Sequence, residues 1–159
     1  MVTYIDEDFE AGNSNALPWT FSGAAEWQVS TSRSVSPGTH SLRSGDLNGI
    51  GGKSSVVSIK VDSSLGAYFT FDYYVGIGAP FDMFEFRVDD DLKHMDKSPG
   101  GVWKQYLQNL SPGPHTISFH VITYSPFPSF DRNLDVDEFG EGFVYLDNLE
   151  FQALSRRRN

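Results

Sequence analysis

Hydrophobic and polar side chains alternate along most of this chain, and helical periodicity is nearly absent. In the segment 67–75 every odd position is apolar or aromatic, whereas the even positions include Thr70 and Asp72. The same alternation recurs in three further segments, 57–61, 84–88 and 116–121. A period of two with one apolar face is typical of antiparallel strands that cover a core on one side. Weaker runs predict additional strands near residues 2–9, 27–30, 40–44 and 102–107.

Turn signals separate these strands. Pro and Gly cluster at 36–38, 48–52, 98–101 and 111–114. Nine or ten short strands without a helix predict an all-β fold, a two-sheet antiparallel jelly-roll β-sandwich. We expect one domain over residues 1–154, followed by a basic tail at 155–159. The long irregular stretch 125–142 is of a length that is usually functional or disordered.

Composition and charge narrow the classes of function. The chain has 159 residues, of which 14% are aromatic, enough for a sizeable core. It has no cysteine, which excludes disulfides, thiolate metal sites and a cysteine nucleophile. The net charge is −9, and all 21 acids precede a terminal run of three arginines at 156–158. A body this acidic repels phosphate backbones, so we expect no nucleic-acid partner.

The sequence also bears on location. No apolar run approaches the ~20 residues of a membrane helix, so we expect no membrane insertion. Met1 leads directly into a strand pattern without a basic start or an apolar stretch, so no signal peptide is expected. Either a signal has been removed, or the protein leaves the cell by another route, such as inside a virion.

Short motifs follow one another in a recognisable order. They include Asp8-Phe9-Glu10-x-Gly12, Gly38-Thr39-His40-Ser41-Leu42 and Tyr145-Leu146-Asp147-Asn148-Leu149. Over residues 5–151 this order resembles the concanavalin A-like jelly-roll superfamily, specifically its MAM-like adhesion modules and related carbohydrate-binding modules. The resemblance implies two antiparallel sheets, non-catalytic binding, an extracellular, cell-surface or virion location, and often a structural calcium ion. The chain departs from MAM modules in lacking their cysteines and in carrying the long stretch 125–142.

The resemblance assigns calcium ligands at the two ends of the chain, Glu10 and Asp147, with Glu7 as the next choice. Because Asp147 shares parity with Tyr145 and Leu149, we expect its side chain to face the core or its edge. First and last strands lie close in a jelly roll, and two carboxylates with main-chain carbonyls suit Ca²⁺. The alternative is that Asp147 accepts backbone N–H groups or pairs with Arg43, without metal.

A second candidate calcium site lies in the acidic stretch that begins at Asp131. Asp131, Asn133 and Asp135 alternate with other residues, as oxygen ligands that wrap a calcium ion do. Val136 stands where an EF-hand loop requires its glycine, and Glu141 comes one residue early for the bidentate acid. The alternative is a solvated acidic loop.

The same stretch permits an enzyme hypothesis. Laminarinase-type jelly-roll glucanases carry two catalytic acids on one strand face, and Asp135, Asp137 and Glu141 share strand parity. The leading acid is Asp instead of Glu, the second gap is too long, and Gly140 interrupts the strand. Retaining hydrolysis needs carboxyls about 5 Å apart, which this pattern does not ensure.

Three aromatic residues stand apart from the strand pattern. Tyr124, Phe127 and Phe130 fall in the long stretch beside two prolines, where exposed rings often contact a ligand or partner. Trp27 and Trp103, by contrast, lie in strand-like runs and are expected in the core.

Together these observations predict a non-catalytic, calcium-stabilised binding or adhesion module that recognises a glycan or protein surface through loops at one edge of the sandwich. One alternative is a phage or virion structural protein, such as a head-decoration or fibre component, in a larger or homo-oligomeric assembly. The other alternative is a jelly-roll glycoside hydrolase.

Overall fold

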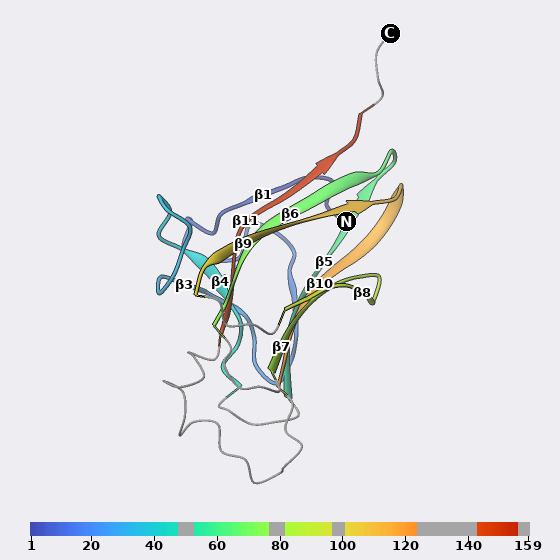
Figure 1. Cartoon of the computed structure of the whole chain (residues 1–159). Helices are drawn as coiled ribbons and strands as arrows, with labels where there is room; N and C mark the ends of the chain where they lie inside the picture. Colours follow the sequence, from blue (N-terminus) through green and yellow to red (C-terminus); the bar gives the residue numbers. More distant parts are fainter. Residues whose placement is uncertain (48–52, 77–81, 97–100, 124–142, 156–159) are drawn as a thin grey trace.

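The computed structural model describes residues 1–47, 53–76, 82–96, 101–123 and 143–155, which form eleven strands in two antiparallel sheets (Figure 1). The six-stranded sheet has the order β3 (Gln28–Ser30), β4 (Ser41–Arg43), β11 (Val144–Ala153), β6 (Ala67–Val75) and β9 (Trp103–Leu110), with β1 (Ile5–Glu7) also paired to β11. The five-stranded sheet has the order β2 (Thr20–Gly23), β5 (Lys53–Ser63), β10 (Gly113–Thr123), β7 (Asp82–Val88) and β8 (Asp91–Asp96). The predicted β-sandwich is confirmed.

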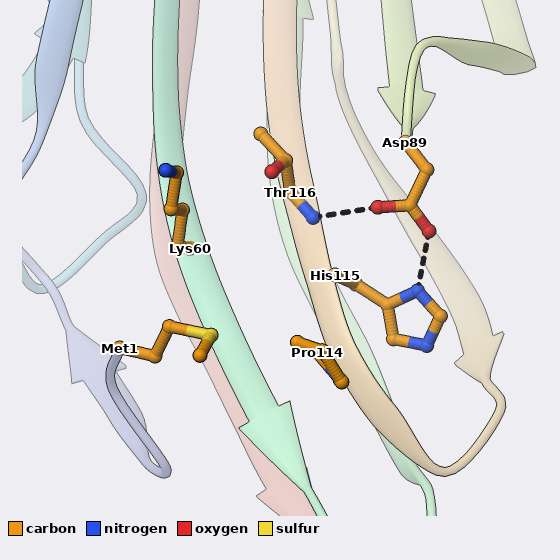
Figure 2. A pocket seen from close by; sticks show the side chains of 6 residues that line it. All are labelled: Met1, Lys60, Asp89, Pro114, His115 and Thr116. Atoms are coloured by element: carbon orange, nitrogen blue, oxygen red, sulfur yellow. Dashed lines mark hydrogen bonds and ion pairs between the residues drawn. The ribbon is translucent and has the colours of Figure 1, made fainter.

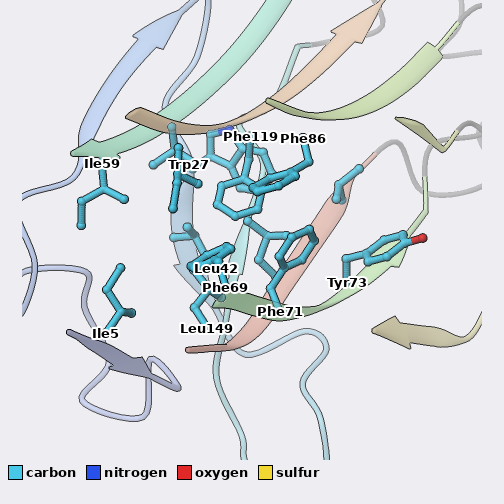
Figure 3. Packing of buried hydrophobic residues seen from close by; sticks show 14 of the residues in the cluster. Ile5, Trp27, Leu42, Ile59, Phe69, Phe71, Tyr73, Phe86, Phe119 and Leu149 are labelled. Atoms are coloured by element: carbon cyan, nitrogen blue, oxygen red, sulfur yellow. The ribbon is translucent and has the colours of Figure 1, made fainter. Parts of the chain in front are cut away.

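The alternating segments supply the core as predicted. In β6 the odd positions are buried, and β5, β7 and β10 bury one face each against them. Phe71 of the six-stranded sheet meets Phe119 of the five-stranded sheet edge to face, with ring centroids 4.9 Å apart (Figure 3). Such aromatic pairs contribute about 0.5–1.5 kcal/mol beyond their buried area. Trp27 is only 2% exposed and lies in this core, as expected.

The two ends of the chain meet in the six-stranded sheet. Strand β1 pairs with β11 so that Ile5 lies opposite Phe151 and Glu7 opposite Leu149. This pairing confirms that the first strand runs beside the last one. It brings the acidic segment that follows β1 to the middle of β11.

The parity expected for β11 is wrong because the strand contains a bulge. Its pairing with β6 shifts register between Asp147 and Glu150, and Asn148 there has a φ of 49°. A bulge inserts an extra residue and exchanges the two faces beyond it. Val144 and Leu146 therefore point into the core before the bulge, and Leu149 and Phe151 do so after it. Asp147 consequently lies on the outer face.

Within the described ranges, no helix is long and apolar enough to span a membrane.

Candidate functional site

A pocket of about 320 Å³ lies where the segment after β1 meets the loop between β3 and β4. Its lining combines carboxylates from both ends of the chain with that loop: Asp8, Glu10, residues 35–38, Asp147 and Asn148. The two acids assigned as calcium ligands are thus brought together, 137 positions apart in sequence. Asp8 joins them instead of the expected Glu7. The Glu7 carboxylate turns aside and accepts the Phe9 N–H at 2.7 Å.

Asp147 is buried although it faces outward from its sheet. Its side chain is covered by the loop 31–40, and only 1% of the residue is exposed. One carboxylate oxygen accepts the Val35 N–H at 2.9 Å and the other accepts the Asn148 N–H at 2.8 Å. Burial raises the pKa of Asp147 to about 6, and the negative charges of Glu10 and Asp72 add to the rise. The predicted alternative of backbone N–H acceptance is therefore present, whereas pairing with Arg43 is not.

A tight turn aims Glu10 at the same loop. Phe9 is fully buried and has a φ of 61°, an unusual conformation for a bulky residue. The turn is closed by side chains, since Asp8 Oδ1 accepts the Glu10 N–H at 3.0 Å, and by the Gly12 N–H, which donates to the Phe9 carbonyl at 3.0 Å. The turn after β1 therefore directs the Glu10 carboxylate back over the sheet.

The Glu10 carboxylate holds the far end of the loop. It accepts the Thr39 N–H at 2.9 Å, the His40 N–H at 2.8 Å and the Thr39 hydroxyl at 2.9 Å. These hydrogen bonds, that from the Thr39 N–H first, lower the pKa of Glu10 to about 2. Gly38 lies so close that a Cβ there would approach Glu10 Oε2 to 2.9 Å. Sequence reasoning identified 36–38 as a turn, but nothing in the pattern showed that it closes over both acids.

The pocket presents carboxylate oxygens, which are the ligand type that a hard divalent cation prefers. Asp147 is a buried acid beside a second acid, and no cationic side chain in the described part of the chain contacts it. Among the described residues, no three His, Asp or Glu side chains converge closely enough to hold a metal ion by themselves. A calcium ion would therefore also need main-chain carbonyl oxygens, which are ordinary calcium ligands.

A second notable feature crosses the outer face of the six-stranded sheet. Strand register places Arg43 of β4 opposite Tyr145 of β11, Tyr145 opposite Tyr74 of β6, and Tyr74 opposite Trp103 of β9. We call these four residues the arginine–aromatic row. Ring centroids lie 5.7 Å apart for Tyr74 and Trp103, and 6.1 Å apart for Tyr74 and Tyr145.

Two arginines make cation–π contacts in and over this row. The Arg33 guanidinium, from the loop 31–40, lies 4.3 Å from the Tyr74 ring centroid, and that of Arg43 lies 4.3 Å from the Phe143 ring. Cation–π contacts of this kind fix the orientation of a guanidinium plane. Trp103 is half-buried on this outer surface and outside the core cluster, so its expected core position is wrong. Alternation along β9 could have predicted the outward position, since Trp103 lies on the same strand face as Gln105 and Leu107, which are exposed.

A serine, a histidine and an aspartate also come together at the start of β10. His115 Nδ1 lies 2.6 Å from Asp89 Oδ2, and its Nε2 lies 3.2 Å from Ser111 Oγ. Figure 2 shows Asp89 bridging the Thr116 N–H and the His115 ring beside a pocket of about 260 Å³. Nε2 is also 2.8 Å from the Ser111 carbonyl, which can only accept, so Nε2 carries the proton.

This arrangement does not match a hydrolase triad, in which Nε2 must accept the serine proton. The hydrogen bond to Asp89 raises the pKa of His115, which favours the doubly protonated ring still further. The three side chains instead tie the β7–β8 turn to the start of β10.

The remaining predicted residues lie outside the described ranges. They are the aromatic set Tyr124, Phe127 and Phe130, the acidic set Asp131, Asn133 and Asp135, and the glucanase-like acids Asp137 and Glu141.

Comparison with known proteins establishes the fold and not a family. No family model matches the sequence, and no curated protein matches it. Solved structures do match. A cleaved adhesin domain of Lys-gingipain from Porphyromonas gingivalis is 15% identical, covers 96% of this chain and 99% of its own, and has a TM-score of 0.63.

Two carbohydrate-binding modules are similar to the same extent. TmCBM61, solved with β-1,4-galactotriose, is 17% identical with a TM-score of 0.61, over 92% of this chain and 94% of its own. The CBM22-1 xylan-binding domain from Paenibacillus barcinonensis is 12% identical with a TM-score of 0.60, over 96% and 95%. The chain therefore has a β-sandwich like those of carbohydrate-binding modules and adhesin domains. The MAM-like assignment stays a prediction.

Proposed function

We propose that this protein is a non-catalytic binding module that holds a glycan against the outer face of its six-stranded sheet. The observation that carries the proposal is the arginine–aromatic row, which crosses four adjacent strands in a single register. Similar folds in a galactotriose complex, a xylan-binding domain and an adhesin domain support the same class of function.

The row has the geometry that a sugar chain needs. Neighbouring strands are about 4.8 Å apart, so the row extends across four strands. Tyr145 and Tyr74 are only 1% and 9% exposed and support the row from beneath, whereas Arg43 and Trp103 at its two ends are half-buried and can reach a ligand. Rings packed against one another lose little conformational entropy when a ligand binds. Trp103, half-buried at the edge strand, offers an indole face for stacking against a sugar ring. The guanidinium of Arg43 and the amide of Gln28, which lies opposite Arg43 in β3, supply hydrogen-bond donors.

Calcium belongs to the proposal as a structural ion held by Glu10 and Asp147. When bound, it supplies positive charge where two acids now repel each other. Glu10 and Asp147 both bind the loop 31–40, and this loop carries Arg33 over Tyr74. Metal binding at the pocket and the shape of the row are therefore mechanically connected.

The loop contacts predicted from sequence remain part of the proposal. We expect Tyr124, Phe127 and Phe130 to contribute to the same ligand or to a partner chain, with location outside the cell or on a virion still a prediction. Catalysis is not part of it, and we expect no reducing ends from β-glucan, xylan or alginate.

Alanine substitution on β9 tests the binding face. Trp103→Ala is expected to weaken binding at least about tenfold, because tryptophans in binding surfaces are often hot spots. Binding is measured on a glycan array or with polysaccharides in affinity gels. Leu107→Ala is the matched control, because Leu107 is 53% exposed on the same face of the same strand. Equal binding by wild type and Trp103→Ala, or equal loss in both variants, would contradict the proposed face.

A further inference from the structure

We propose that Arg43 recognises a single carboxylate on an otherwise neutral glycan, so that the ligand is an acidic sugar carried by an uncharged chain. This inference rests on the proposed glycan-binding function and names the ligand class of the same face.

Arg43 is held in the row without a counter-ion from the residues that the structure describes. Its guanidinium lies over the Phe143 ring, and its side chain is half-buried. Within the described ranges, no carboxylate pairs with it, and its buried Nε has no hydrogen-bond partner. An unsatisfied buried donor is costly, and the cost is greater for a charged group.

The two other partly buried cations on described strands, Arg87 and Lys104, are both paired, whereas the unpaired strand lysines are exposed to water. Arg87 Nη2 lies 2.6 Å from Glu85 Oε1, and Lys104 Nζ lies 2.8 Å from Asp96 Oδ2. In a chain with net charge −9, acids are abundant, so a half-buried arginine that none of the described acids contacts is notable. The simplest occupant for its free edge is an acid that comes with the ligand.

The chemistry of the group selects a carboxylate. A guanidinium presents parallel N–H donors that match the two oxygens of a planar carboxylate. The cation–π contact leaves those in-plane donors available while it covers one face of the group. The sugar chain would then extend from Arg43 toward the half-buried Trp103, above the buried Tyr145 and Tyr74 rings.

Charge also limits how many carboxylates the ligand carries. Asp72 and Asp147 form the neighbouring cross-strand pair on the same face, and the whole chain is acidic. A polyanion would be repelled by this field, whereas one carboxylate aimed at one guanidinium is not. We therefore infer isolated acidic sugars, either uronic acid branches or terminal sialic acids.

Paired ligands test this inference. The first pair is glucuronic acid-substituted xylan and the same polymer with its carboxyls reduced to alcohols. The second pair is sialyllactose and lactose. The wild-type protein is expected to prefer the carboxylated member of at least one pair by about 10–100-fold, the range for a hydrogen bond to a charged group. The pair that responds identifies the source of the carboxylate.

Variants of Arg43 distinguish the paired N–H donors of the guanidinium from its positive charge alone. Arg43→Gln should remove the preference, and Arg43→Lys, which keeps the charge but loses the paired donors, should restore only part of it. Lys60→Gln is the control, because it removes one exposed positive charge from the five-stranded sheet. Unchanged melting temperatures for all three confirm that the fold is intact.

The outcomes distinguish the two proposals. Equal wild-type affinity for both members of each pair, with loss in Trp103→Ala, overturns the carboxylate inference and leaves the glycan-binding function standing. Preference for heparin that falls equally in Arg43→Gln and Lys60→Gln also overturns it. No binding to any glycan contradicts both.

Discussion

Each outer face of the sandwich carries a buried carboxylate, and the two differ in their partners: one pairs with an arginine and the other accepts backbone N–H groups. Glu85, on the five-stranded sheet, is 5% exposed and accepts Arg87 Nη2 at 2.6 Å and Nε at 2.9 Å. Asp147, on the six-stranded sheet, is 1% exposed, and its partners in the described part of the chain are two backbone N–H donors. Burial raises its pKa to about 6, whereas the Glu85 charge is matched by a neighbour two residues away.

The contrast extends to the arginines. Arg87 is bonded to an acid of its own strand, while Arg43 on the other sheet lies over an aromatic ring instead. The buried charge of Glu85 on the five-stranded face is therefore neutralised by a residue of the same strand. On the six-stranded face, among the residues that the structure describes, Asp147 has no cation partner and Arg43, in the adjacent row, has no acid partner. A surface built in this way is suited to ions and ligands from outside.

Calcium gives the largest expected effect on this contrast. Binding to the folded state alone stabilises it by about 4 kcal/mol at a thousandfold excess over Kd, or roughly 8–16 °C in Tm for a domain of this size. Asp147→Ala should abolish the shift in a melting experiment, whereas Asp135→Ala should leave it. The reverse result would move the site to the acidic stretch after Asp131. A melting curve that is the same in EDTA and in excess Ca²⁺ would contradict both sites.

The pH dependence of the metal-free protein gives the next largest effect. The pKa of Asp147 in the folded state is about 6, above its ordinary value of 3.8. Its stabilising contribution is therefore complete below pH 3.8, where it is protonated in both states, and is lost as pH rises through 6. Asp147→Asn should stabilise the metal-free protein at pH 8 by up to about 3 kcal/mol and change little at pH 3.5.

Denaturant titrations in EDTA at both pH values measure this difference. With saturating Ca²⁺ the sign should reverse at pH 8, because asparagine is a weaker ligand than a carboxylate. Glu85→Gln is the control, and it should not be stabilising at either pH, since it removes the acid of an existing ion pair. If Asp147→Asn is less stable than wild type in EDTA at pH 8, the protein itself stabilises the charged carboxylate and no metal is needed for that.

On the five-stranded face, loss of a charge should destabilise the protein, because the buried Glu85 has a cation partner there. Arg87→Gln leaves the Glu85 carboxylate buried without its cation, and we expect a loss of about 2 kcal/mol at pH 7. Adding Glu85→Gln to this variant should recover part of the loss, because the remaining side chains are then neutral. Urea unfolding of the single and double variants measures the coupling. A double variant less stable than Arg87→Gln would show that Glu85 is held by other groups.

The sequence predicted the elements that alternate and missed those that depend on distant contacts. The strand at 67–75 could be predicted because every second side chain enters one core. Glu10 and Asp147 could be paired by resemblance, since first and last strands are adjacent in such folds. The facing of Asp147 could not be predicted, because a single residue at Asn148 exchanges the faces of β11. Strands β2 and β8 were also missed.

The arginine–aromatic row could not be predicted from local sequence pattern either. Tyr74 and Trp103 each have a simple strand pattern, but their alignment with Arg43 depends on the register of four strands that are distant in sequence. Nothing local specifies that register. The loop 31–40 is a further example, because its role arises from Glu10, 29 positions from Thr39.

The smallest expected effect comes from the glycine that lets this loop close over Glu10. A Cβ at Gly38 would lie 2.9 Å from Glu10 Oε2 and 3.1 Å from the Val35 carbonyl oxygen. Gly38→Ala therefore displaces the carboxylate slightly, and we expect a stability loss of about 1 kcal/mol or less in EDTA. Calcium affinity should fall several-fold, since ligand oxygens must sit at 2.3–2.6 Å from the ion. Calorimetric titration measures it, with Ser36→Ala in the same loop as control. A Gly38→Ala variant that binds Ca²⁺ like wild type would show that Glu10 is not a ligand, and the contrast between the two faces would then rest on Asp147 alone.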